Sequence, residues 1–273
     1  MRTNDDGAPA EGELDPYLEA AHDALEAGHP EHALAEAAAS PDAEGRALLE
    51  VRAHLFLGHL KAAEGALERA ATLIGEEDLD VLELTGELAF SSWNLETARR
   101  AFMVVLEDGG EDDSFLLERL ALLADLEGEE AAADELMMRA VAADPERTSL
   151  VQVADEVFDR HVEAALGSLD PRFRAAMENT RVVREPVPFK ELVDPSRPGE
   201  TPPDILGLFA GATIHDTPTE AELPPTIYLF KRNLERMARD EAHLAEEIRI
   251  TLFHEIGHLL GLDEDEVASM GLA

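Results

Sequence analysis

The chain has 273 residues, of which 60 are acidic and 22 basic, giving a formal net charge of −38 at pH 7. Because contacts to phosphate groups need clusters of Lys and Arg, this charge excludes nucleic acid and anionic membranes as expected partners. The absence of cysteine excludes disulfides and thiolate metal sites. The length is sufficient for two modest domains, each with its own core.

The N-terminus predicts a disordered tail without an export signal. Residues 1–14 are mainly Gly, Ala, Pro, Asp and Glu with a single leucine. They can bury too little apolar surface to offset the conformational entropy that is lost on ordering. They contain neither the basic nor the apolar region of a secretory signal, and no apolar run in the chain approaches the roughly 20 residues of a membrane span. We therefore expect a cytoplasmic location.

Residues 15–150 carry an internal repeat. The sequence is almost wholly helix-forming here, with Ala, Leu and Glu dominant and helix breakers confined to short gaps. Alanines recur at Ala33, Ala63, Ala98 and Ala133, each five residues after a turn position, at Gly28, Gly58, Trp93 and Gly128. This spacing resembles the tetratricopeptide repeat (TPR), a pair of antiparallel helices of about 34 residues. The resemblance implies an all-α helical-repeat domain; the alternative is a helical bundle without a true repeat, because the aromatic positions of the repeat are mostly absent.

A helical-repeat array provides a concave surface for a peptide or a partner protein, and its acidic character would favour a basic one. The competing interpretation is that the array only covers, or dimerises, the C-terminal domain. We expect Trp93 and His54, which fall on helical segments, to be packing residues rather than ligands.

The composition changes after residue 150. Residues 1–150 hold 36 acidic and 10 basic residues, a charge of −26, whereas residues 151–273 hold 24 and 12, a charge of −12, which favours a domain boundary at this point. The patterns predict helices over 151–166, 171–178 and 240–260, strands over 181–187 and 204–211, a proline-flanked edge strand that begins at Thr226 and enters a helix at Asn233, and a proline-rich loop over 194–204.

The last predicted helix contains the pattern H-E-x-x-H. His254 and His258 are one helical turn apart, so both imidazoles can reach one metal ion, a geometry that suits zinc. Glu255 lies about 100° further round the helix, where a carboxylate could take a proton from water at the metal. The competing interpretation is a chance match on plain helix surface. The apolar helix before the motif and the glycine stop at Gly261 favour a site.

The residues after Gly261 supply carboxylates for a third ligand. In the extended pattern H-E-x-x-H-x-x-G-x-x-ligand, the last position is Glu264. Two imidazoles and one carboxylate are an accepted catalytic zinc set, which leaves a fourth position for water. Asp263 and Asp265 are neighbours of the same type, so Glu264 is chosen by spacing alone. The remaining C-terminal histidines, His161, His215 and His243, are expected at the surface or in local hydrogen bonds.

Residues 155–273 resemble the small zincin-like family of bacterial minimal metallopeptidases. The resemblance rests on the proline-flanked stretch 227–234 and on the stretch 254–266 with its H-E-x-x-H motif. It implies a compact α/β domain, here residues 151–273, with zinc held by His254, His258 and an acidic residue, Glu264, and with Glu255 as the catalytic base. Members commonly carry aspartate at the third-ligand position, which leaves open whether Glu264 or Asp263 coordinates.

The sequence therefore predicts a multidomain protein, with a TPR-like all-α domain followed by a small zincin-like α/β domain. The leading hypothesis is a zinc-dependent metallopeptidase acting on a peptide or protein substrate, which lies extended along the edge strand near Tyr228, while the repeats recruit a substrate or partner. The rival is a non-catalytic zinc-binding scaffold that acts through its repeats. A third possibility is a degenerate site without metal.

Overall fold

The computed structural model describes residues 15–109, 113–144, 150–174, 176–194, 199, 201–211, 224–262 and 266–267. The predicted N-terminal tail lies outside these residues. By their internal contacts, the residues group into two compact units. Unit 1 comprises Met1–Glu111 and Asp194–Pro202, and unit 2 comprises Asp112–Val193 and Pro203–Ala273.

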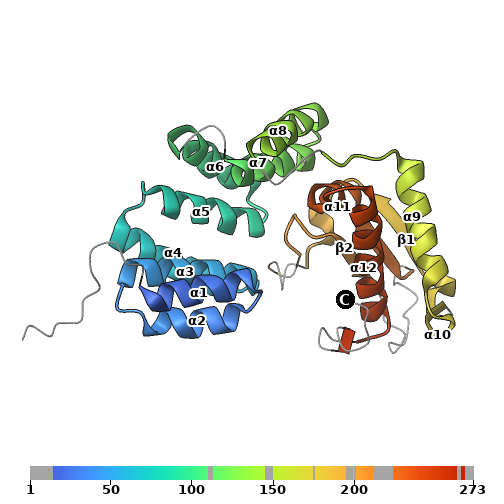
Figure 1. Ribbon diagram of the computed structural model, residues 1–273, viewed down its shortest axis with the longest axis horizontal. Coiled ribbons are helices and arrows are strands. Elements are labelled where there is room, and N and C mark those ends of the chain that lie inside the picture. Colours follow the sequence, from blue (N-terminus) through green and yellow to red (C-terminus); the bar gives the residue numbers. More distant parts are fainter. Residues whose placement is uncertain are drawn as a thin grey trace, which may run out of the picture. The chain divides into compact units, whose positions relative to one another are not determined.

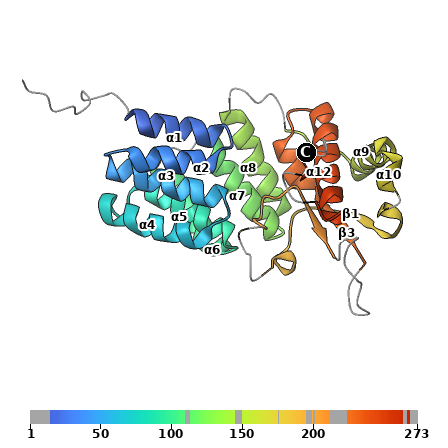
Figure 2. The ribbon, with the colours of Figure 1, turned by 90° about the horizontal axis from the view of Figure 1, so that it is seen from below.

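Consecutive helix pairs make up the N-terminal part of the chain (Figures 1 and 2). The helices are α1 (Pro16–Glu26), α2 (Pro30–Ala39), α3 (Ala43–Phe56), α4 (Leu60–Ile74), α5 (Leu79–Ser91), α6 (Leu95–Gly109), α7 (Ser114–Leu126) and α8 (Glu130–Ala143). Within the pairs α1–α2, α3–α4, α5–α6 and α7–α8, a three-residue turn joins two helices that pack on each other. The predicted helical-repeat architecture is confirmed.

The four turns inside these pairs share one geometry. Each contains a residue with positive φ, at Gly28 (76°), Gly58 (66°), Trp93 (58°) and Gly128 (79°). In each turn the N–H of the following residue donates to the carbonyl five residues back, as Asn94 does to Ala89 at 2.8 Å. This is the Schellman end of a helix, which satisfies carbonyls that the last turn leaves unpaired. The turn positions inferred from the repeat are therefore confirmed.

The small residues of the repeat lie where the helices approach most closely. Ala63, Ala98 and Ala133 are fully buried, and Ala33 is 1% exposed. On α5, a β-carbon added at Gly86 would lie 2.4 Å from the Phe102 ring of α6, so only glycine permits this packing. The register of small residues therefore reflects close helix contact.

We predict that Gly86→Ala destabilises the fold by roughly 1–3 kcal/mol, because the methyl group overpacks against the Phe102 ring. The matched control is Gly65→Ala on α4, where the nearest neighbouring atom is the end of the Arg69 side chain at 3.8 Å. That change should stabilise by roughly 0.5–1 kcal/mol through helix propensity alone. Urea unfolding measures both free energies, and equal effects would contradict the packing argument.

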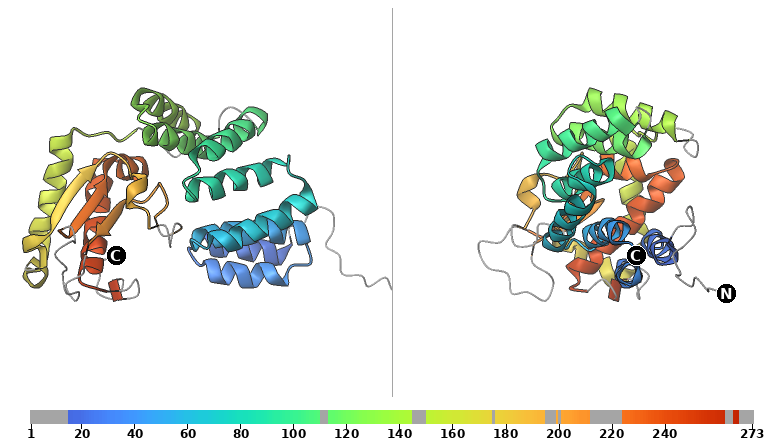
Figure 3. Two further views of the ribbon diagram at one scale, coloured as in Figure 1. Left: turned by 180° about the vertical axis from the view of Figure 1, so that it is seen from behind. Right: turned by 90° about the vertical axis from the view of Figure 1, so that its left-hand side faces the viewer.

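Unit 2 contains a small sheet with helices. Its C-terminal elements are α9 (Asp155–Ser168), α10 (Pro171–Arg174), η1 (Ala176–Asn179), β1 (Arg181–Glu185), η2 (Lys190–Leu192), β2 (Gly207–Ala210), β3 (Thr226–Phe230), α11 (Lys231–Met237) and α12 (Glu241–Leu259). The strand order is β1-β3-β2, with β3 parallel to β1 and antiparallel to β2. Helix α12 covers one face of the sheet (Figures 1 and 3) and packs against α9. The predicted small α/β region is confirmed.

The prediction that the strand beginning at Thr226 is an edge strand is wrong. Strand β3 lies between β1 and β2 in the sheet, and its Ile227 and Leu229 side chains are fully buried. The last of the prolines that suggested an edge strand is Pro225, one residue before β3 begins. Because Pro225 lies outside the strand, its missing N–H removes no hydrogen bond between the strands. The helix after it begins at Lys231, two residues earlier than predicted.

The core of unit 2 forms between α12, α9 and the covered face of the sheet. Four residues of α12 at four-residue spacing, Leu244, Ile248, Leu252 and Ile256, are fully buried. They cluster with Phe158 of α9 and with the buried side chains of β3. Helix α12 is therefore fixed by these buried apolar residues. Within the described residues, no helix is long and apolar enough to cross a membrane.

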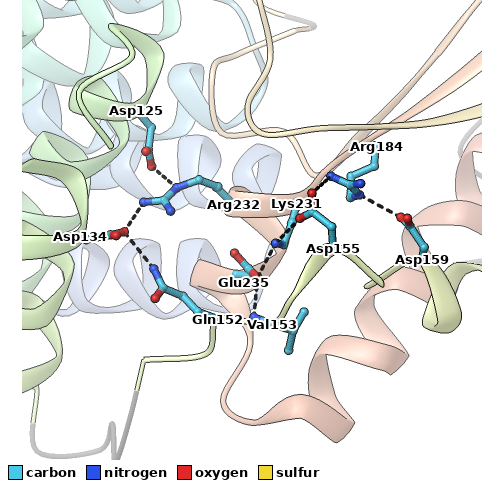
Figure 4. A network of polar contacts seen from close by, with 10 residues as sticks. All are labelled: Asp125, Asp134, Gln152, Val153, Asp155, Asp159, Arg184, Lys231, Arg232 and Glu235. Carbon is cyan, nitrogen blue, oxygen red and sulfur yellow. Dashed lines mark hydrogen bonds and ion pairs between the residues drawn. The ribbon is translucent and has the colours of Figure 1, made fainter. Parts of the chain in front are cut away.

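A charged network joins α7 and α8 to α11 within unit 2 (Figure 4). Arg232 donates through Nε to Asp125 at 2.8 Å and through Nη2 to Asp134 at 2.6 Å. The Asp125 side chain is only 1% exposed and also pairs with Arg236. Burial lowers the pKa of the Arg236 guanidinium to about 10. This pKa is still well above neutral pH, so the guanidinium remains charged. The last helix pair of the repeat is thus held to the C-terminal elements by ion pairs, and the Asp125 carboxylate in them is buried.

The network continues along α11 to the sheet. Lys231 donates to Asp155 at 2.7 Å, and Arg184 of β1 pairs with Asp155 and Asp159. Contacts therefore place α7 and α8 with the C-terminal elements, although the repeat pattern extends through them. The domain boundary expected between residues 150 and 151 stays a prediction.

We predict that Asp125→Asn costs about 3 kcal/mol of stability, since it removes a buried carboxylate charge that pairs with both Arg232 and Arg236. The control is Asp159→Asn, because that carboxylate is 52% exposed and pairs with Arg184 at the surface. An exposed pair is worth less than about 1 kcal/mol. Chemical unfolding of both variants measures the difference, and a cost for Asp125→Asn no larger than that of the control would overturn this ranking.

Candidate metal centre

Helix α12 carries the H-E-x-x-H motif in its last two turns. The helix begins after Asp240, whose side chain accepts the N–H of His243 at 2.8 Å, a normal N-cap. It ends in a Schellman motif, in which Gly261 has a φ of 76° and the Leu262 N–H donates to the Gly257 carbonyl at 3.1 Å. The predicted helix and its glycine stop are confirmed, so the motif lies on a helix.

The two histidines of the motif converge on one point. The Nε2 atoms of His254 and His258 are 3.0 Å apart, and their rings meet edge to face with centroids 4.7 Å apart. Both residues are partly buried. Two zinc–nitrogen bonds of about 2.0–2.1 Å at a tetrahedral angle place the nitrogens about 3.4 Å apart. The observed separation is close to this value, so the pair fits a single zinc ion.

The third ligand stays a prediction. Glu264 and its alternative Asp263 lie outside the described residues, as does Asp265. Among the residues that the structure describes, no group of three His, Asp or Glu side chains is placed to hold a metal. Leu262 before this stretch and Val267 after it both pack on the core that contains α12.

Glu255 lies in the contact between α12 and β2. It is only 7% exposed, and its Oε2 accepts the backbone N–H of Phe209 at 2.7 Å. The carboxylate is thus beside the two histidines along the helix and hydrogen-bonded to the sheet. Sequence reasoning placed Glu255 beside the ligands but missed this backbone partner.

The Phe209 N–H, which donates to Glu255, points away from the neighbouring strand β3. In the antiparallel β2–β3 pair, the Phe230 N–H donates to the Leu206 carbonyl at 2.9 Å. Because hydrogen-bonded and non-bonded pairs alternate, Leu208 and Ala210 also face β3, while the backbone groups of Gly207 and Phe209 face outward. Among the described residues β2 is therefore an edge strand, with outward N–H and C=O groups beside Glu255.

Two glycines allow this close packing. A β-carbon at Gly207 would lie 2.6 Å from Cγ2 of Thr251 and 3.1 Å from Cγ of Glu255, so β2 approaches α12 only because residue 207 has no side chain. A β-carbon at Gly257 would lie 2.5 Å from the fully buried Val267, which packs on α12. The available signal for Gly207 was a glycine inside a strand pattern, which often marks a close backbone approach.

Two histidines outside the motif make local contacts, as expected. His161 lies 3.3 Å from Glu241, and His243 lies 3.0 Å from Glu247. His215 lies outside the described residues. Trp93 is 7% exposed, as expected of a packing residue, but it lies in the turn between α5 and α6 and not on a helix.

Comparison with known families agrees with this geometry. Residues 177–272 match the family model of zincin-like metallopeptidases. Of the described elements, the matched segment includes β1, β2, β3, α11 and α12 with the motif. No curated protein matches the chain. The match confirms the resemblance over this segment, suggests hydrolase chemistry and implies zinc binding.

We predict that His258→Ala weakens zinc binding by at least about 100-fold, because even changes to residues behind a metal ligand cost 10–100-fold. The control is His243→Ala, on the same helix but outside the motif, which should retain wild-type affinity. Competition with a chelator of known affinity measures both. Zinc binding by His258→Ala at wild-type strength would exclude the histidine pair as the site.

Proposed function

We propose that the protein is a zinc-dependent metallopeptidase whose active site lies between the end of α12 and the outer edge of β2. One observation carries the proposal: two converging imidazole nitrogens and a buried carboxylate lie beside an outward-facing strand edge. A peptidase needs these parts together, namely a metal site, a proton acceptor and a surface that holds a peptide backbone.

His254 and His258 would hold the ion, with Glu264 as the third ligand and Asp263 as its alternative. When bound, zinc would supply a Lewis acid that polarises the substrate carbonyl and acidifies water. Glu255 accepts the proton of the attacking water as the new carbon–oxygen bond forms. It then donates that proton to the amine nitrogen as the carbon–nitrogen bond breaks.

The peptide would pair with β2. The outward N–H and C=O groups of Gly207 and Phe209 can form an antiparallel or parallel ladder with an extended backbone. This replaces the expected location beside Tyr228, because β3 is the central strand and β2 is the edge next to the motif. The scissile bond would then lie beside Glu255 without any rearrangement of the sheet.

Peptide pairing would also free the catalytic base. In the structure the Phe209 N–H is already used by Glu255. A substrate carbonyl that pairs with this N–H replaces the carboxylate, which then turns from the strand towards the histidines. Glu255 is thus released when a peptide occupies the edge, so substrate binding prepares the base.

The helical repeats would recruit the substrate or a partner protein. Residues 1–150 carry a charge of −26, so the proposed partner is a basic segment. Salt would weaken such recruitment, because exposed charges are screened within about 10 Å at 0.1 M ionic strength.

We predict that Glu255→Gln lowers peptide cleavage by about 10²–10⁴-fold while zinc binding is retained. Glutamine keeps the side-chain oxygen that accepts the Phe209 N–H, so the local structure is preserved and only proton transfer is lost. The control is Glu246→Gln, whose carboxylate is 52% exposed and pairs with Arg249. Mass spectrometry of a broad peptide library, incubated with zinc-loaded protein, measures cleavage.

Three outcomes separate the hypotheses. Loss of cleavage in Glu255→Gln alone supports the peptidase. Cleavage by that variant at the wild-type rate excludes Glu255 as the base. A wild-type protein that binds zinc but cleaves no library peptide would favour a zinc-binding scaffold that acts through its repeats.

A further inference from the structure

The face of the sheet that points away from α12 carries a row of apolar side chains. In β3, the buried Ile227 and Leu229 point towards α12 and cluster with its core residues, so Tyr228 between them points to the opposite face. The register partners of Tyr228, which are Val183 of β1 and Leu208 of β2, lie on that face with it. These three residues, the outer row, cross the sheet from β1 to the edge strand.

The outer row is apolar although it is not fully buried. All three of its residues are partly exposed. Phe189, which is 37% exposed, meets the Tyr228 ring edge to face with centroids 5.9 Å apart and extends the apolar surface. A sheet face that contacts only water carries polar side chains at its outward positions. Contiguous apolar side chains at such positions indicate an interaction surface.

Leu208 ends the outer row at the edge where the proposed substrate pairs. The outward backbone groups of Gly207 and Phe209 lie on either side of it, and the Phe209 N–H donates to Glu255 at 2.7 Å. Residues directly opposite one another on neighbouring strands have their side chains on the same face of a sheet. A peptide paired with β2 would therefore place one side chain next to Leu208, away from α12. This holds for a parallel and for an antiparallel peptide.

The two faces of β2 would sort the side chains of this peptide. The residue opposite Phe209 points towards α12, and its two neighbours point to the other face, one next to Leu208 and one next to Ala210. The partner of Ala210 in β3 is Thr226, so this second position adjoins a small residue and a polar one. Of the two neighbours, the one next to Leu208 therefore meets the apolar outer row.

We propose that Leu208 determines substrate specificity, and that the protein selects peptides with a bulky apolar residue next to it, such as leucine or phenylalanine. This peptide side chain would cover Leu208 and extend the outer row by one strand. Apolar surface on both side chains is then removed from water, which favours an apolar residue over a polar one of equal size. The selection of cleavage sites rests on the proposed peptidase function, whereas the preference in binding does not require catalysis.

Cleavage of a random peptide library by the zinc-loaded protein tests the selection of cleavage sites. Mass spectrometry counts the residues around each cut. We expect leucine to be enriched about fivefold over asparagine, which is of similar size, at one position near the cut, as an apolar cross-strand contact provides. Leu208→Thr keeps a β-branched residue that suits a strand and should remove most of this enrichment. The control is Val183→Thr, at the far end of the outer row, which should retain it.

A charge at the same position provides a gain of preference that loss of structure cannot imitate. Leu208→Lys should replace the apolar preference by one for aspartate or glutamate at the same position, because opposite charges on neighbouring strands attract. An apolar preference that persists in Leu208→Lys would overturn the proposal. So would wild-type cleavage without an apolar preference, or equal loss of the preference in Leu208→Thr and Val183→Thr.

Peptide binding separates this inference from the proposed function. Glu255→Gln, in which cleavage is expected to be lost, is titrated with fluorescein-labelled hexapeptides that alternate serine with leucine or serine with asparagine, and fluorescence polarisation reports Kd. We expect the leucine peptide to bind about fivefold more tightly, and Leu208→Thr in the same background to remove the difference. If wild type cleaves no library peptide, the peptidase function fails and this comparison decides alone. Equal binding of the two peptides to Glu255→Gln would overturn the proposal, whether or not the wild type is active.

Discussion

The contact between α12 and β2 is the interaction on which the candidate site depends. It brings a helix with two metal-binding side chains against a strand edge, and Gly207 permits the approach by lacking a side chain. The Glu255 carboxylate lies at the centre of the contact, where it accepts the Phe209 N–H. The buried apolar residues of α12 lie on the same face of the helix as Glu255 and pack in the core of the domain, so the packing of the helix and the placement of the chemistry have one cause.

The helical repeats have two features that their spacing in the sequence did not predict. Three of the four repeat turns use glycine at positive φ, and the fourth uses Trp93, which reaches Thr201. By their contacts, α7 and α8 belong to the same unit as the C-terminal elements. The buried pairing of Asp125 with Arg232 and Arg236 holds them there.

Features with a fixed local spacing were predictable from the sequence. His254 and His258 are four residues apart on a helix, so their convergence follows from helix geometry. The turns at Gly28, Gly58 and Gly128 follow in the same way from glycine and the repeat register. The resemblance to the zincin-like family rested on such local patterns, and residues 177–272 match that family model.

Features that depend on pairing across the chain were not predictable. The Phe209 partner of Glu255 is set by the register of β2 on β3, which no local pattern encodes. The central position of β3 was missed because Pro225 borders the strand without entering its ladder. The docking of Thr201 on Trp93 joins residues 108 positions apart.

The most direct test of the central claim is a crystal structure of the zinc-loaded protein, with anomalous diffraction recorded at the zinc edge. The account predicts one zinc peak about 2.1 Å from Nε2 of both His254 and His258, with one carboxylate oxygen from residues 263–264 and a position occupied by solvent. No peak between the two imidazoles, or four protein atoms closing the coordination sphere, would contradict it.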